Sequence, residues 1–197
     1  VLKFYFESYI TPKKLYEFDL ESEKLTFISQ KQYNNFDFNH YESKKIWAIS
    51  GDGVKIPISL FYRKDLFKKD GSSPMFLEAY GAYGAYDYEY FDSKKLSLAD
   101  RGFVVGEAHV RGGGYLGKKW HLDGIGRKRI NRFRDFISCS EHLIREKYTS
   151  SDRLVTYGRS AGGQIMSAIL NMRPDLYKCV LSIVPGVDVV NAFYDKG

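Results

Sequence analysis

The sequence predicts an α/β fold in which helices cover an open, mainly parallel sheet. From residue 75 onward, short and continuous apolar runs alternate with longer amphipathic segments. The runs are too short for helices and rich in β-branched or aromatic residues, which indicates strands buried on both faces. The segments between them repeat apolar residues every three or four positions, as helices that cover a sheet do. Strands that alternate with crossover helices form an open α/β sheet.

The pattern places each element of this half in order. Strands are expected at 75–79, 103–110, 154–157 and 179–184, and helices at 93–100, through 130–144 and at 161–172. The first helix ends before Gly102, and the last one stops before Pro174 because the residue preceding a proline disfavours helical backbone.

The first part of the chain has a different pattern. The β-type runs 3–10 and 15–20, separated by polar stretches, predict an antiparallel meander and the end of an all-β unit. The composition changes near residue 45, where we place the boundary. The runs 46–50 and 54–62 flank Gly51, Asp52 and Gly53 and predict a hairpin, in which Pro57 places the second strand near a sheet edge.

Composition excludes several classes of protein. The 197 residues are 44% hydrophobic and 27% charged, which excludes a disordered or low-complexity chain. There is no apolar run long enough for a membrane span and no basic start followed by an apolar stretch, so we expect a soluble, cytoplasmic protein without a membrane partner. Cys139 and Cys179 are expected to be reduced core thiols. Because the chain begins with Val1, we expect a fragment or a processed product.

The net charge of +6 is scattered along the chain. Its densest basic run, 126–134 (GRKRINRFR), lies at the start of the long expected helix. We interpret it as a solvated helix face rather than a nucleic-acid stripe, because no nucleic-acid-binding motif accompanies it.

The most informative segment for function is 154–166, where a strand is followed by Gly158, Arg159, Ser160, Ala161 and Gly162 and then by a helix. A G-x-S-x-G sequence between a strand and a helix is the pattern of a nucleophile elbow. The serine then lies at a helix N-terminus, where the backbone amide of the next residue stabilises an oxyanion. We therefore predict that Ser160 is a nucleophile rather than an ordinary helix cap, with Ala161 as an oxyanion donor.

Two further glycine-rich turns follow the expected strands at 75–79 and 103–110. Sites in open α/β sheets lie at the carboxyl ends of strands, so these turns and the elbow are expected to outline one site. Tyr80 comes directly after its strand, and we predict that its hydroxyl is a second oxyanion donor, whereas Tyr83 is expected to pack. Arg111 either clamps a carboxylate or forms an internal salt bridge.

Five blocks, in order and at fitting distances, resemble the prolyl oligopeptidase family of serine peptidases. They are 80–84 (YGAYG), 96–103 (LSLADRGF), 109–114 (HVRGGG), 158–163 (GRSAGG) and 184–190 (VPGVDVV). The resemblance covers nearly all of residues 46–197. It implies the N-terminal part of an α/β-hydrolase domain, preceded in residues 1–45 by the last strands of the family's seven-bladed β-propeller.

The resemblance also implies a function. Ser160 would be acylated, with the Tyr80 hydroxyl and the Ala161 amide as the oxyanion hole and with no cofactor or metal. Ala161 and the pair at 109–110 resemble the branch of the family that cleaves oligopeptides after Lys or Arg. The family's acidic pair for a further basic residue falls at Tyr88 and Tyr90, with Asp87 and Glu89 only beside them, so that subsite departs from the pattern.

The acid and the histidine of a triad follow the serine in this fold, yet His40, His109, His121 and His142 all precede Ser160. We expect structural roles for His109 and His121, and a chain that is inactive or nearly so by itself, because an alcohol without a base acylates poorly. The leading hypothesis is a serine peptidase of which this chain is a part. A non-catalytic remnant or a subunit complemented by a separate C-terminal polypeptide, and a small esterase, stay open as alternatives.

Overall fold

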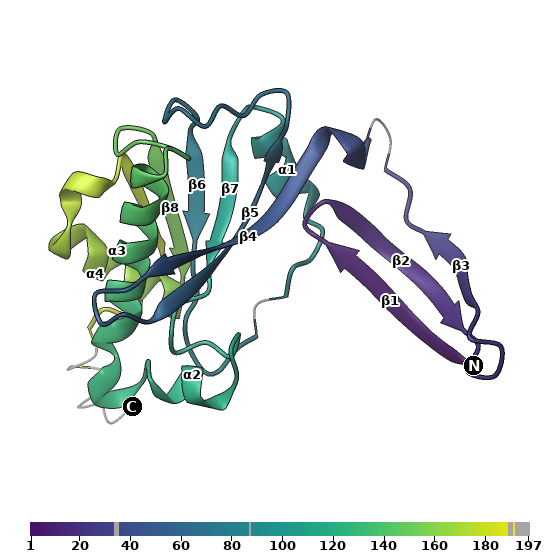
Figure 1. The fold of residues 1–197 in the computed structure, drawn as a ribbon. Coiled ribbons are helices and arrows are strands. Elements are labelled where there is room, and N and C mark those ends of the chain that lie inside the picture. Colours follow the sequence, from purple (N-terminus) through teal and green to yellow (C-terminus); the bar gives the residue numbers. More distant parts are fainter. Residues whose placement is uncertain (34–35, 87, 189–190, 192–197) are drawn as a thin grey trace.

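The computed structural model describes residues 1–33, 36–86, 88–188 and 191, and in this part of the chain it contains two sheets (Figure 1). The first is an antiparallel sheet in the order β1-β2-β3, formed by β1 (Leu2–Ser8), β2 (Thr11–Phe18) and β3 (Leu25–Gln30). The second has the order β4-β5-β7-β6-β8-β9. Its strands are β4 (Tyr41–Ile49), β5 (Lys55–Arg63), β6 (Met75–Glu78), β7 (Val104–Ala108), β8 (Leu154–Arg159) and β9 (Cys179–Ile183).

The helices lie in the half of the chain that the sequence assigned to an α/β fold. They are α1 (Ser93–Ala99), α2 (Lys118–Leu122), α3 (Ile130–Arg145) and α4 (Ala161–Met172), with short 3-10 turns at Phe38–His40, Gly126–Lys128 and Pro174–Leu176. The expected bounds of α4 are confirmed at both ends, and those of α1 and the strands of this half are confirmed to within about two residues. Among the described residues, no helix is both long and apolar enough to cross a membrane.

The larger sheet separates two cores. Ile56, Ile58 and Leu60 of β5 join the core under α3 and α4, whereas Phe61 joins the core under α1. This alternation follows the period of two along a strand, and it lets β5 be buried on both faces. Tyr9, from the turn after β1, stacks on Phe61 with ring centroids 5.3 Å apart. The N-terminal sheet thus contacts the α1 side of the larger sheet.

The expected hairpin and the expected parallel strands are both present, but the position of the second hairpin strand differs from the expectation. β7, β6, β8 and β9 are parallel, but β4, β5 and β7 pair antiparallel. β5 is an inner strand rather than an edge strand. Pro57 is tolerated there because it lies just before the paired stretch, which begins at Ile58 opposite Ala108, so the carbonyl of Pro57 accepts from His109 and its missing N–H is not required.

Two further expectations need correction. Residue 45 lies inside β4, all nine residues of which pair with β5, so the two sheets are divided between β3 and β4. Cys139 is fully buried, but Cys179 is exposed because it begins β9, the last strand of the described sheet.

Candidate active site

Ser160 lies between the last residue of β8 and the first residue of α4. Its backbone has φ 55° and ψ −117°, which a side chain with a Cβ rarely adopts. The backbone N–H of Ser160 donates to the carbonyl oxygen of Ile183 at 2.9 Å, so β9 holds the turn in place. The side chain is exposed and does not cap α4. The strained strand-to-helix turn expected of a nucleophile elbow is therefore present.

The glycines on either side of Ser160 are required by close backbone contacts. A Cβ on Gly158 would collide with the carbonyl of Gly162, and a Cβ on Gly162 would collide with the carbonyl of Ala79 at the end of β6. A Cβ on Gly163 would lie 2.9 Å from the carbonyl oxygen of Ile183. The small residues thus bring the ends of three strands together around the serine.

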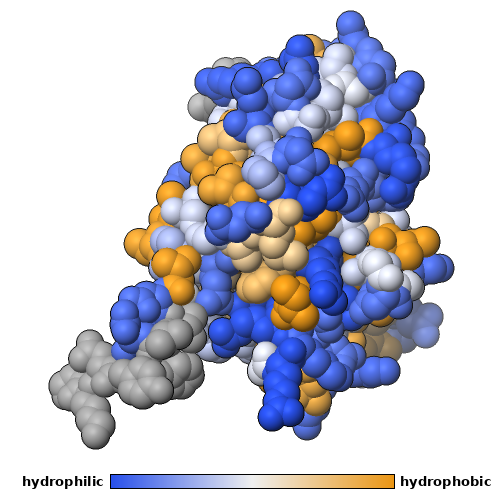
Figure 2. Space-filling model, turned by 90° about the vertical axis from the view of Figure 1, so that its left-hand side faces the viewer, coloured by the Kyte–Doolittle hydropathy of each residue, from blue (hydrophilic) through white to orange (hydrophobic). Residues whose placement is uncertain are grey.

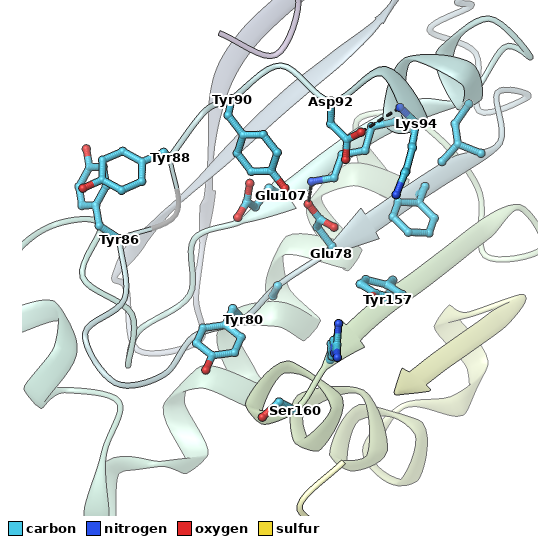
Figure 3. Close-up of a pocket in the computed structure, with 15 residues that line it drawn as sticks. Glu78, Tyr80, Tyr86, Tyr88, Tyr90, Asp92, Lys94, Glu107, Tyr157 and Ser160 are labelled. Atoms are coloured by element: carbon cyan, nitrogen blue, oxygen red, sulfur yellow. Dashed lines mark hydrogen bonds and ion pairs between the residues drawn. The ribbon is translucent and has the colours of Figure 1, made fainter. Parts of the chain in front are cut away.

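A first cavity of about 770 Å³ opens beside Ser160 at the carboxyl ends of β6 and β8. Tyr80 follows β6 and lines this cavity together with Ser160, and its hydroxyl is directed toward the side on which Ser160 lies (Figure 3). Ala161 begins α4, and N–H groups in the first turn of a helix have no acceptor within the helix. The structure therefore brings together the three residues that the sequence predicted for the site.

Aromatic side chains form one wall of the first cavity. Tyr86, Tyr88 and Tyr90 all line it, and Tyr88 is 70% exposed. Glu89 points elsewhere, since its carboxylate accepts from the Ser59 hydroxyl at 2.8 Å and pairs with Lys45 at 3.3 Å. Asp87 lies outside the described residues. Glu89, the described acidic neighbour of Tyr88 and Tyr90 in the sequence, is therefore not among the residues that line this cavity.

Three carboxylates that line this cavity were not predicted from the sequence, namely Asp92, which caps α1, and Glu78 and Glu107. Glu78 forms an ion pair with Lys95, whose ammonium also lies 5.5 Å from the ring centre of Tyr90. Glu107 accepts a hydrogen bond of 2.6 Å from the Tyr9 hydroxyl, and burial followed by the charge of Glu107 raises the pKa of Tyr9. For Glu78 and Glu107, the signal in the sequence was an acidic residue inside or at the end of an apolar strand, which is costly unless it is paired.

A second cavity of about 580 Å³ borders Ser160 as well. Ser160, Ala161 and Gln164 line one side of it. The residues that line the other side include His121, Arg129 and Arg132. Ser160 thus stands between two cavities of different composition.

Neither histidine near the glycine-rich turns bonds to Ser160 in the structure. His109 is 1% exposed, its Nε2 lies 2.9 Å from the Ser59 hydroxyl, and its ring stacks on Tyr115 with centroids 3.7 Å apart. Burial lowers the pKa of His109 to about 3, so it is neutral at pH 7. His121 lines the second cavity, but its Nδ1 lies 2.7 Å from the Gly112 carbonyl oxygen, a contact that requires a proton on Nδ1. Both contacts agree with structural roles.

The structure decides between the two roles that were left open for Arg111, a carboxylate clamp and an internal salt bridge. Its guanidinium donates to both carboxylate oxygens of Asp135, at 2.8 and 2.6 Å, and to Asp52 at 2.6 Å. Arg111 therefore forms an internal salt bridge that fixes the turn after β7. The expectation that Tyr83 packs is wrong, because its side chain is 81% exposed at a left-handed position with φ 56°.

A strained serine between a parallel strand and a helix, at the carboxyl edge of an α/β sheet, defines the class of hydrolases that use a nucleophile elbow. Comparison with known proteins identifies the family. Residues 89–196 match the model of the prolyl oligopeptidase family of peptidases, and the chain belongs to this family.

Curated relatives match along nearly the whole chain. Dipeptidyl aminopeptidase BI of Pseudoxanthomonas mexicana is 40% identical over 195 residues, which are 98% of this chain and 27% of that protein. Protease 2 of Moraxella lacunata is 35% identical over 191 residues, or 96% of this chain and 28% of that protein. The solved structure of oligopeptidase B from Leishmania major has a TM-score of 0.90 and 36% identity, and it covers 98% of this chain and 27% of its own. The chain thus spans about a quarter of the length of these relatives.

Proposed function

We propose that Ser160 is the acylated nucleophile of a serine peptidase that hydrolyses peptide bonds in oligopeptides, with the Tyr80 hydroxyl and the Ala161 amide stabilising the oxyanion. The observation that carries the proposal is the left-handed backbone of Ser160 at the start of α4. This backbone costs free energy, and such strain is found where it serves a site. It directs the hydroxyl away from the helix and toward solvent between the two cavities.

In the proposed reaction, Tyr80, Ala161 and Ser160 have separate roles. The Tyr80 hydroxyl and the Ala161 N–H donate hydrogen bonds to the substrate carbonyl oxygen as it becomes negatively charged, and the N-terminus of α4 favours that charge. Ser160 supplies the oxygen that forms the acyl bond, and the amine of the substrate leaves with a proton. His109 is buried against Ser59, and His121 makes no hydrogen bond to Ser160, so in this proposal the base that takes the serine proton comes from outside residues 1–197.

The unpaired edge of the larger sheet supports that part of the proposal. β9 is the last described strand of the sheet, and Cys179, Leu181 and Ile183 along it are exposed on one face. Exposed apolar side chains are grouped on this side of the molecule in Figure 2. Unpaired edges pair readily with further chain. We propose that a polypeptide segment with the acid and the histidine packs here.

We propose a preference for Lys or Arg before the cleaved bond. It is supported by the pattern around Ser160, by the likeness to oligopeptidase B from Leishmania major and by the match to Protease 2. Other relatives are named prolyl endopeptidase and dipeptidyl aminopeptidase, so the preference has to be measured.

The N-terminal sheet supports a propeller origin for the segment before β4. β1, β2 and β3 form an antiparallel meander, and Leu2, Phe4, Leu25 and Phe27 on it are exposed. A sheet with so many exposed apolar side chains packs against further sheets in a larger protein. We propose that this sheet is the end of a β-propeller that limits access to the site.

The proposal is tested by mixing this chain with the segment of the Pseudoxanthomonas mexicana relative that follows its match to this chain. Fluorogenic peptides with Arg, Lys or Pro before the reporter group, and a short acyl ester, are the substrates. We expect release after Arg and Lys that depends on both polypeptides and is lost in Ser160→Ala. Release from the ester alone would support an esterase instead, and release that persists in Ser160→Ala would refute the role of Ser160.

A further inference from the structure

The second cavity beside Ser160 has a one-sided charge. Arg129 and Arg132 line it, and none of the described residues that line it is Asp or Glu. A concave site walled by one sign of charge concentrates ligands of the opposite sign. The cavity therefore favours an anionic group close to the candidate nucleophile.

Arg132 is the buried member of this pair. The residue is 5% exposed on α3, which corrects the expectation that the whole basic run at 126–134 is a solvated face. One terminal nitrogen donates to the Gly81 carbonyl oxygen at 3.5 Å, and the other donates to Oε1 of Gln164. Its Nε is buried and has no hydrogen-bond partner among the described residues. No carboxylate of the described residues forms an ion pair with the Arg132 guanidinium.

In the described part of the chain, Arg132 lacks the carboxylate partners that the other buried arginine, Arg111, has. Arg111 is 4% exposed and is bonded on two sides by Asp135 and Asp52. Arg132 is equally buried, but its partners are neutral oxygens. Burial, followed by the charge of Arg129, lowers the pKa of Arg132 to about 10, which leaves it charged at pH 7. A buried charge without a counter-ion is costly, and it persists where a ligand supplies the opposite charge.

Gln164 connects this guanidinium to the elbow. It accepts from Arg132 and donates to the carbonyl oxygen of Gly186 at 2.9 Å, so its amide is fixed at both ends. Its backbone N–H bonds to the carbonyl oxygen of Ser160 at 3.1 Å, one helical turn along α4. Arg132 is thereby bonded to a residue whose backbone lies one turn of α4, about 6 Å along the axis, from that of Ser160.

We propose that Arg132 is a substrate-binding residue that holds a carboxylate of the peptide substrate in the second cavity. Arg132 lines the cavity without a carboxylate partner among the described residues, and the planar array of N–H donors on a guanidinium matches the oxygens of a carboxylate. The carboxylate is either an acidic side chain near the cleaved bond or the free C-terminus of a short peptide. This inference rests on the proposed peptidase function, since it assigns the anion to the substrate.

Peptide binding tests the proposal without requiring catalysis. The Ser160→Ala chain is titrated into fluorescently labelled peptides that contain one Arg, and binding is followed by anisotropy. One pair of peptides differs by Glu or Gln next to the Arg, and a second pair differs by a free or an amidated C-terminus. We expect one carboxylate form to bind at least about tenfold more tightly than its neutral counterpart, as charged hydrogen bonds predict. The pair that shows the difference identifies the source of the carboxylate.

Variants of the arginine assign the effect. Arg132→Gln should abolish the preference for the carboxylate, Arg132→Lys should retain part of it, and Arg134→Gln, an exposed arginine on the same helix, should leave it unchanged. Unfolding in urea checks that Arg132→Gln is folded. Equal binding of both members of each pair, a preference that survives Arg132→Gln, or no binding of any peptide at about 1 mM would each overturn the proposal. An intact carboxylate preference, together with no hydrolysis by the unmutated chain mixed with the segment of the Pseudoxanthomonas mexicana relative, would instead refute the proposed function.

Discussion

Removing the carboxylate of Asp135 should be among the most destabilising single changes in this chain. Asp135 is fully buried on α3 and accepts three hydrogen bonds from Arg111, at 3.0 Å from the backbone N–H, 2.8 Å from Nε and 2.6 Å from a terminal nitrogen. Asp135→Ala leaves the buried guanidinium with Asp52 as its remaining carboxylate. Breaking a buried ion pair by removing one partner costs about 3–5 kcal/mol.

Asp52 offers a matched control on the same guanidinium. Its side chain is 46% exposed, and its bond to Arg111 is as short as the strongest bond to Asp135. Water screens that pair, so Asp52→Ala should cost about 1 kcal/mol or less. If geometry alone set the energy of a salt bridge, the two variants would be equally stable. If burial sets it, they should differ by several kcal/mol.

Urea unfolding followed by tryptophan fluorescence measures the difference. With a slope of about 2 kcal/mol per M, Asp135→Ala should lower the midpoint by about 2 M, and Asp52→Ala by about 0.5 M or less. Equal shifts for the two variants would refute the reasoning. Asp135→Asn keeps one acceptor oxygen and should fall between them.

Three further expectations can be checked on the same chain. Because burial holds the pKa of His109 at about 3, the unfolded state gains a proton between pH 6.5 and 3 that the folded state does not. Folding stability should therefore fall by about 2 kcal/mol between pH 7 and 5 in urea titrations, and His109→Gln should remove this loss whereas His40→Gln, an exposed histidine, should not. Gly162→Ala should lower the free energy of unfolding by about 1–3 kcal/mol because its Cβ meets the carbonyl at the end of β6, while Gly51→Ala has open space; equal stability of the two variants would contradict the contact. Ellman's reagent should titrate one thiol per native chain, and Cys179→Ser should abolish that reaction, because the other cysteine is buried with its pKa raised; two reactive thiols in the native state would show that the core is open.

Local signals in the sequence were sufficient for the elements that carry the site. The bounds of α4 followed from the glycines beside Ser160 and from Pro174. These residues act on the local backbone conformation, independently of tertiary contacts. The gathering of Tyr80, Ser160 and Ala161 followed from a general property of parallel strands, whose carboxyl ends meet at one edge.

Features that depend on tertiary neighbours were not predictable in the same way. Because of Pro57, β5 was expected at an edge, since the sequence does not reveal that β7 pairs only from Ile58 onward. The basic run did not reveal that Arg132 alone turns inward, because helical position becomes informative only when the start of α3 is known. An acidic residue in an apolar strand marks Glu78 and Glu107 as unusual in the sequence, but that both line one cavity follows only once β6 and β7 are seen to be neighbours.

The central claim is that Ser160 is a nucleophile whose base lies outside this chain. Labelling with a fluorophosphonate probe, read by mass spectrometry, tests it most directly on the chain alone and on its mixture with the segment of the Pseudoxanthomonas mexicana relative that follows the match. We predict labelling at Ser160 in the mixture and none on the chain alone over the same time. Labelling of the chain alone that is lost in His121→Gln would place the base inside the chain and contradict the account, as would labelling of the mixture that persists in Ser160→Ala.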